Sequence, residues 1–421
     1  MRYTAWEEFW WNSITGARTV VDRVAMALLE NKMVVLKVPS DLPWRYPMRS
    51  AIQNAFNERT DARDIVIETI DAVDNNPTDQ EPGRFILQTY ASSSIRTGYR
   101  EKSRISIQDY ISDRNVIKNR IIWVKGLDQR TAGKWLSFCR GFSPRSAADG
   151  LFVLEVHGNF TSGDSRYIQS IDFDDCVSSY DVQQFNSFIM DESSYSTDWK
   201  RYIAAAAASV CGTDAELSAM LLEQVDFRSE TAVDGLQRID RQGDFDRRGA
   251  EDGSDHPLRY LRTGGTAELW HRIWTAQIQV LFPLIELERQ KLIEKWHDSI
   301  EEALQENHVE QFGAAVTDPA EVELGTLCYM MRCRVSGDYR MLYIPEEADR
   351  EEDWEKGISS PAPLPAGTGA PAQAARAAAA SMEKFTSRLQ VIMDTSRPSR
   401  FTAAWPRGMV YSSSGISSFL A

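Results

Sequence analysis

The sequence predicts an α/β fold in its first half, with a parallel sheet covered by helices, and a mainly helical second half. Two short and strongly apolar segments, 120–124 and 151–156, are typical of strands that are buried on both faces. Segments with helical spacing alternate with the strand-like ones, and this alternation favours a parallel sheet. After about residue 180 the strand-like segments nearly vanish.

The first elements of the chain form a helix, a strand and a second helix. Apolar residues recur at helical spacing from 17 to 29, which predicts an amphipathic helix. Residues 33–38 are a β-branched run that ends at Pro39, and we expect a buried strand there. Because the stretch 48–56 is again typical of a helix, this part is expected to form a β-loop-α unit.

The other elements of the first half continue this alternation. Further strands are expected at 65–70, 84–89, 120–124, 151–156 and 167–173. Helices are expected at 105–111 and 131–139. The sheet is therefore expected to hold its helices on both faces.

The second half is expected to be helical throughout. Its helices are predicted at 179–190, 199–210, 214–225 and 266–304. The last of these carries a continuous apolar face, with Trp270, Trp274, Ile278 and Leu281. We expect this face to be buried in the core of its own domain, because such a surface does not stay exposed on a soluble monomer.

Composition shifts along the chain predict four regions. An α/β domain is expected at 1–190 and a helical domain at 191–358, with a mobile Asp-, Gly- and Arg-rich loop at 240–255. Residues 359–380 are rich in Pro, Ala and Gly and are expected to be a linker. The last region is a tail, 381–421.

Composition also limits where the protein works. The 421 residues are 43% hydrophobic, enough for at least one full core, and no long uncharged apolar run predicts a membrane span. The first residues carry Glu7 and Glu8 and do not resemble a secretory signal. Five scattered cysteines favour a reducing compartment over a disulfide framework. A cytoplasmic location is therefore expected.

Taken in order, the predicted strands and helices from about residue 15 to 190 resemble the core of P-loop ATPases of the AAA/STAND type. In this resemblance the strand before Gly126-Leu127-Asp128 is the Walker B strand, whose terminal acid organises magnesium and water. The strand 151–156 is the sensor strand, with Asn159 near its polar end. The helices that begin near Asp181 are similar to the lid of this family.

The loop that holds phosphate in that family is not matched. A phosphate loop needs glycines, so that backbone N–H groups converge on the anion, followed by a Lys and a hydroxyl residue. The stretch 39–50 has no glycine; its three prolines lack N–H donors, and it includes Asp41 and Trp44. Asp128 can equally be a turn residue at the end of a strand.

We therefore expect a non-catalytic pseudo-ATPase without a cofactor or metal, which binds a protein partner or a second copy of itself. A weak resemblance to bacterial proteins of mobile or defence loci suggests a regulatory or antiphage defence assembly. The first alternative is a nucleotide-gated STAND-like switch that binds ATP with Mg. Its pocket would be formed by Arg45, Arg49, Ser50, Asp128 and Asn159.

The second alternative is a subunit that binds nucleic acid. Its patch would be formed by Arg96, Arg100, Lys102 and Arg104, with Tyr99 between them. The formal charge of −14 argues against broad adhesion to nucleic acid, although a local basic patch is compatible with it. A solvated loop is the simpler interpretation of this cluster.

Overall fold

The computed structural model describes residues 3–60, 64–72, 81–100, 104–157, 160–250, 254–332, 334–335 and 339–342. The chain divides into two compact units, which are described separately below. The first unit combines residues 1–225 with 232–276, and the second combines 226–231 with 277–421. The predicted linker 359–380 and the tail 381–421 lie outside the described residues.

The first unit is built on a five-stranded parallel sheet, which confirms the predicted α/β class. Its strands are β1 (Met33–Lys37), β2 (Val66–Asp71), β3 (Arg120–Leu127), β4 (Leu151–Val156) and β5 (Ile168–Asp172). The strand order is β2-β3-β4-β1-β5, and every neighbouring pair is parallel. This order is P-loop-like, because β4 lies between β1 and β3.

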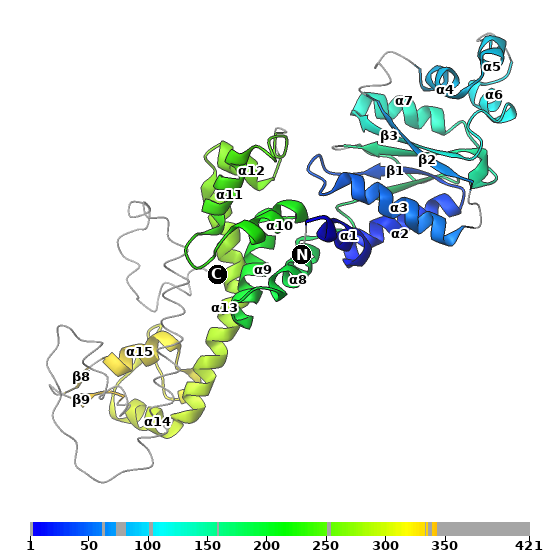
Figure 1. Cartoon of the computed structure of the whole chain (residues 1–421). Helices are drawn as coiled ribbons and strands as arrows, with labels where there is room; N and C mark the ends of the chain where they lie inside the picture. Colours follow the sequence, from blue (N-terminus) through cyan, green and yellow to red (C-terminus); the bar gives the residue numbers. More distant parts are fainter. Residues whose placement is uncertain are drawn as a thin grey trace. The chain divides into compact units, whose positions relative to one another are not determined.

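Helices cover both faces of this sheet (Figure 1). The helices α1 (Tyr3–Ser13), α2 (Thr15–Leu29) and α3 (Arg45–Arg59) pack together, and α2 contacts β1 and β5. On the opposite face, α7 (Gln129–Cys139) packs on β3 and β4. The six residues of β4 are all buried between these layers, as expected for a central strand without polar alternation.

A helix replaces the strand that the sequence predicted at 84–89. This helix, α4 (Pro82–Tyr90), begins with Pro82 in its first turn, where a missing N–H is tolerated. Its buried residues Phe85, Ile86 and Leu87 face α7 and the neighbouring short helices α5 (Ser93–Gly98) and α6 (Ile107–Asp113). The prediction was wrong because a short apolar run fits either a strand or one side of a helix.

The helices after the sheet belong to the same unit as the sheet. They are α8 (Ser179–Asp191), α9 (Thr197–Cys211), α10 (Ala215–Gln224), α11 (Ala232–Gln242) and α12 (Pro257–Arg262). Ser178 and Asp181 form a capping box at the start of α8, and Asp181 also accepts a hydrogen bond from the Gly16 backbone at 2.8 Å. This contact fixes α8 against α2.

The predicted helix 266–304 consists of two helices. α13 (Thr266–Lys295) ends just before Trp296, whose non-helical backbone caps α14 (His297–Glu306). The buried residues at the start of α13 are Leu269, Ile273 and Ala276, whereas Trp274 is 43% exposed. The expectation that Trp274 lies in the core is therefore wrong, because the buried stripe of the helix is rotated away from it.

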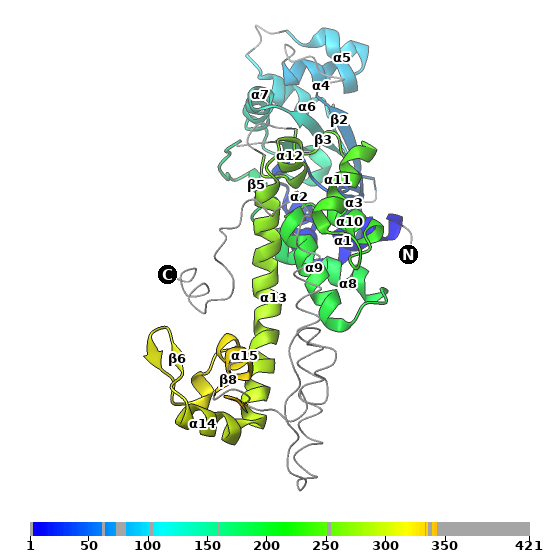
Figure 2. The same ribbon diagram turned by 90° about the vertical axis from the view of Figure 1, so that its left-hand side faces the viewer.

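The second unit has a small core of its own around the end of α13. Ile293 packs there with Ile300, Leu304, Val322 and Met330. Beside α14 this unit contains the short pairs β6–β7 and β8–β9 and the helix α15 (Leu324–Arg332), which Figure 2 shows near the end of α13. Among the described residues, no helix is both long and apolar enough to span a membrane.

Candidate functional site

The candidate site lies where β1 ends, at the carboxyl edge of the parallel sheet, the usual place for ligand sites in α/β folds. The chain leaves β1 at Lys37, passes through the loop 38–44 and enters α3 at Arg45. Trp44 caps this helix with a left-handed backbone, at φ 43°, and its side chain is buried. It packs against Trp10 and Phe185, with ring centroids 6.5 and 5.7 Å away.

A buried carboxylate in the centre of the sheet holds the two arginines of α3. Glu155 of β4 is fully buried. Arg49 reaches its Oε2 with Nε at 3.3 Å and Nη2 at 3.1 Å, and Trp123 of β3 donates its indole N–H to the same oxygen at 2.8 Å. Arg45 lies 3.5 Å from Oε1. We call Arg45, Arg49, Trp123 and Glu155 the Glu155 cluster.

Arg45 also binds the loop 38–44 that precedes its own helix. Its Nη2 donates to the carbonyl oxygens of Pro39 at 3.4 Å and Ser40 at 3.1 Å, and its Nη1 lies 3.4 Å from Nε2 of His157. Burial lowers the pKa of Arg45, and the adjacent Glu155 carboxylate opposes that effect. The guanidinium is therefore engaged by the protein's own oxygens and by one imidazole.

A second carboxylate occupies the amino end of α3. The backbone N–H of Trp44 points out of the first turn, where a phosphate would be bound in a nucleotide site. This N–H donates instead to Oε2 of Glu216 in α10, at 3.1 Å. Pro39, Pro43 and Pro47 have no N–H to offer at this end. The helix end is thus supplied with an internal anion.

Glu216 is itself held by a buried ion-pair group. Arg248 forms ion pairs with both Glu216 and Asp214, and His256 lies with its Nε2 3.1 Å from Asp214. His256 Nδ1 accepts from the N–H of Leu258 at 3.3 Å, so Nε2 is the nitrogen that donates to Asp214. We call Asp214, Glu216, Arg248 and His256 the Arg248 cluster.

The charges of the Arg248 cluster stabilise one another. Burial alone would raise the pKa of Asp214, but Arg248 and His256 outweigh it, so that its pKa lies below the usual range. Burial alone would lower the pKa of Arg248, but the carboxylates of Asp214 and Glu216 raise it above the usual value. Asp214 therefore stays ionised and the Arg248 guanidinium stays charged at neutral pH.

The Arg248 cluster involves the segment 240–255, which the sequence suggested as a mobile loop and of which the structure describes 240–250 and 254–255. α11 continues to Gln242, and the turn that follows carries Arg248 into the cluster. The backbone N–H of Gly249 donates to Asp41 of the loop 38–44 at 3.1 Å. Arg262 binds the carbonyl oxygens of Phe245, Asp246 and Arg248 from α12. This segment therefore braces the candidate site.

Asp128, the Walker B residue of the resemblance, caps a helix. Its Oδ1 accepts from the backbone N–H of Thr131 at 2.7 Å and from the Thr131 hydroxyl at 2.6 Å, at the start of α7. These hydrogen bonds lower the pKa of Asp128. No hydrogen bond or ion pair joins Asp128 to Arg45 or Arg49 within the described part of the chain.

The structure describes two further residues of the nucleotide alternative, Ser50 and Asp128. Ser50 is exposed on α3, and Asn159 lies outside the described residues. In the predicted basic patch, Arg96, Arg100 and Arg104 are exposed on and after α5, while Lys102 lies outside the described residues. Of the described residues of the predicted pocket, the structure thus brings Arg45 and Arg49 together on Glu155.

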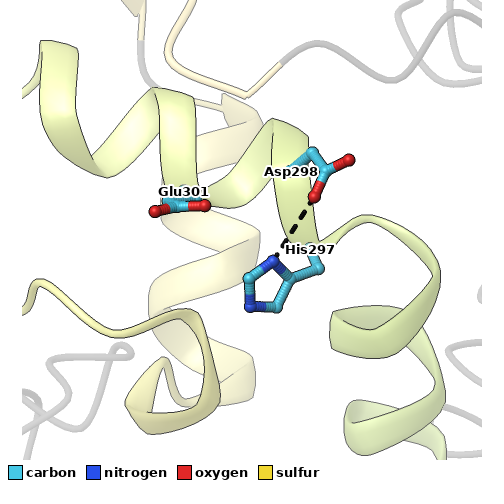
Figure 3. Close-up of side chains that lie close together, drawn as sticks. All are labelled: His297, Asp298 and Glu301. Atoms are coloured by element: carbon cyan, nitrogen blue, oxygen red, sulfur yellow. Dashed lines mark ion pairs between the residues drawn. The ribbon is translucent and has the colours of Figure 1, made fainter.

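One group of described side chains has the spacing of metal ligands. His297, Asp298 and Glu301 lie close together on the first turns of α14 (Figure 3). All three are exposed, and the imidazole Nδ1 is 3.5 Å from a carboxylate oxygen of Asp298. We assign no metal to this group, because exposed acids on one helix face are common without one.

Sequence reasoning missed most of the acids that form the site. Glu155 is a single acid in an otherwise apolar strand, and such a residue signals a buried partner. Asp214 precedes a helix as an N-cap residue, which hides its second role towards Arg248. Glu216 gives no local signal, because its partner Trp44 lies 172 residues earlier.

Comparison with known proteins assigns no family. No protein-family model matches the chain, and no curated protein matches it in sequence.

Proposed function

We propose that the first unit is a pseudo-ATPase domain, in which the protein's own carboxylates replace the phosphates of a nucleotide. The observation that carries this proposal is the hydrogen bond from the Trp44 N–H to Glu216 at the amino end of α3. In a nucleotide site this helix end and the cations beside it bind the anion. Here the protein's own carboxylates already pair with both.

The replacement is supported at each position that a nucleotide would need. The cations Arg45 and Arg49 both pair with the one carboxylate of Glu155. Three prolines in the stretch 39–50 have no backbone N–H to donate, and the ring of Trp44 at the end of the loop 38–44 is buried. Asp128 is committed to the cap of α7. Nucleotide binding would have to break two buried ion-pair groups, each of which costs several kcal/mol to disrupt.

A domain of this kind holds its shape without a ligand and serves as a rigid platform. We propose that it acts as a scaffold subunit that binds a protein partner or a second copy of this chain. A bacterial regulatory or antiphage defence assembly is the setting that we propose, and it rests on the weak resemblance of the sequence alone. The locking contacts between the loop 38–44 and Glu216 and Gly249 support the platform role.

Titration calorimetry with ATP and Mg²⁺ tests the pseudo-ATPase proposal. We expect no heat of binding at about millimolar ATP, which corresponds to less than about 4 kcal/mol of binding free energy. The melting temperature should also be the same with and without nucleotide, because a ligand that does not bind cannot stabilise the folded state.

The result against the proposal is a micromolar Kd that Arg45→Ala or Arg49→Ala abolishes. Arg59→Ala is the matched control, because it removes an arginine from the same helix at its far end, where Arg59 pairs with Asp22. Tight binding that only the first two variants abolish would establish the nucleotide-gated switch.

A further inference from the structure

The charge of this chain is distributed very unevenly. Residues 84–145 contain thirteen Arg and Lys and four Asp and Glu, a net charge of +9. The whole chain carries −14, so the remaining residues carry −23. The basic part includes α4, α5, α6, β3 and α7, which lie at the β2–β3 end of the sheet (Figure 1). One part of an acidic protein is therefore strongly basic.

Contacts between α5, α6 and α7 join the segments that carry the exposed cations of this part. The rings of Tyr99 and Tyr110 lie 5.2 Å apart, and Arg114 stacks over Tyr110 at 5.7 Å. Gln108 of α6 donates to the Phe138 carbonyl at 3.3 Å near the end of α7. We define the basic surface as the exposed residues Arg96, Arg100, Arg104, Arg114, Lys118 and Arg140.

Within the described residues, the cations of the basic surface have no carboxylate partner. None of the six forms an ion pair with any residue that the structure describes. Arg96 donates only to the carbonyl oxygen of Gln88, at 3.3 Å. Arg120 and Lys125, which lie in the adjacent strand, do pair with Glu68 and Asp71. Among the described residues, carboxylates therefore pair with the strand cations and not with the surface cations.

We propose that the basic surface binds the phosphate backbone of nucleic acid. Five of its six cations are arginines, whose planar guanidinium groups match phosphate oxygens with two parallel hydrogen bonds. The strong negative charge of the rest of the chain repels a polyanion and confines it to this face. Backbone contacts of this kind bind without sequence preference.

The chemistry of the surface favours nucleic acid over an acidic protein. A protein partner needs buried aromatic or aliphatic anchors, which supply most of the binding energy. Ile105 is the only exposed large apolar side chain in the described residues from 81 to 145. A surface with free cations and almost no apolar anchor suits a partner whose charge repeats along a backbone.

The basic surface lies at the edge of the sheet away from the Glu155 cluster. Arg114 and Lys118 precede β3, and Arg140 precedes β4, so these three lie towards the amino ends of the strands. The Glu155 cluster and the loop 38–44 lie towards the carboxyl ends. The inference is therefore independent of the proposed pseudo-ATPase, and either can fail alone.

Fluorescence anisotropy with a labelled 30-base-pair DNA duplex of arbitrary sequence tests the proposal. If the full chain neutralises about four phosphates, log Kd should rise with log salt with a slope of about 3.6, which is about 150-fold between 50 and 200 mM NaCl. Arg100→Gln with Arg104→Gln should weaken binding and reduce this slope by about two.

The control removes two exposed arginines elsewhere in the first unit. Arg166→Gln with Arg201→Gln makes the same change in net charge and should leave both the Kd and the slope unchanged. Equal losses in the two double variants, or no binding at 50 mM NaCl, would overturn the proposal. Binding of labelled polyglutamate in place of DNA, lost in Arg100→Gln with Arg104→Gln, would overturn it in favour of an acidic protein.

Discussion

Removing Arg49 tests whether the Glu155 cluster stabilises the fold. Glu155 is fully buried and the Arg49 side chain is 15% exposed, so Arg49→Ala leaves a buried carboxylate without its main partner. Breaking a buried pair in this way typically costs about 3–5 kcal/mol. Trp123 still donates to Glu155 at 2.8 Å, and Arg45 remains 3.5 Å away. We therefore expect Arg49→Ala to lower the free energy of unfolding by about 3 kcal/mol, the lower end of this range, and the melting temperature by roughly 6 °C.

The assay is urea unfolding followed by tryptophan fluorescence, with thermal melting by circular dichroism. Arg59→Ala is the control on the same helix, because its pair with Asp22 is about one-third exposed and should contribute at most about 0.5 kcal/mol. Adding Glu155→Gln to Arg49→Ala should restore part of the loss, since the fully buried carboxylate charge is then gone and only the partly exposed Arg45 remains charged. If Arg49→Ala were as mild as Arg59→Ala, the cluster would not be a stabilising element.

Further substitutions test the capping role of Asp128 and the burial of Ile273 relative to Trp274. Asp128→Ala should cost about 1 kcal/mol through loss of the α7 cap, while Asp128→Asn costs less. Thr131 lowers the pKa of Asp128, so the stabilisation by this cap is complete above the ordinary carboxyl pKa and fades as the pH falls below about 4. Urea unfolding midpoints of the wild type and Asp128→Ala at pH 7 and pH 3 check this expectation. A difference between the two proteins that is as large at pH 3 as at pH 7 would contradict it. Trp274→Ala should lower the free energy of unfolding by less than about 1 kcal/mol, and Ile273→Ala by about 2–4 kcal/mol, because Ile273 is 4% exposed. A larger drop in melting temperature for Trp274→Ala than for Ile273→Ala would disprove this assignment.

The sequence was sufficient for the sheet because its strands carry local signals. β3 and β4 are apolar runs between polar turns, and only a strand buried on both faces explains them. The segment 84–89 was assigned wrongly because its apolar run fits either element, and the choice depends on packing against α7. Local patterns therefore determined the class of the fold but not each element.

From the sequence, only the features that the candidate site lacks could be predicted. The missing glycines and the prolines of 39–50 are visible in the sequence, and they already exclude an ordinary phosphate loop. The carboxylates found at this edge are not visible in the sequence, because Glu155 lies 106 residues from Arg49 and Glu216 lies 172 residues from Trp44. Asp128 looked like a Walker B acid because both roles place a carboxylate just after a strand.

The locking of the loop 38–44 also has a consequence for synthesis of the chain. Asp41 cannot accept its hydrogen bond until Gly249, 208 residues later, has been synthesised, and the Trp44 N–H cannot donate to Glu216 until that residue has been made. At a translation rate of 5–20 residues per second, about 10–40 s pass between the appearance of Asp41 and that of Gly249. Once residue 172 has been made all the strands of the sheet are present, but the amino end of α3 still lacks Glu216 until residue 216 is added. The emerging chain is then open at the edge that the finished protein closes, so this edge is where a chaperone or a cotranslational partner would find it.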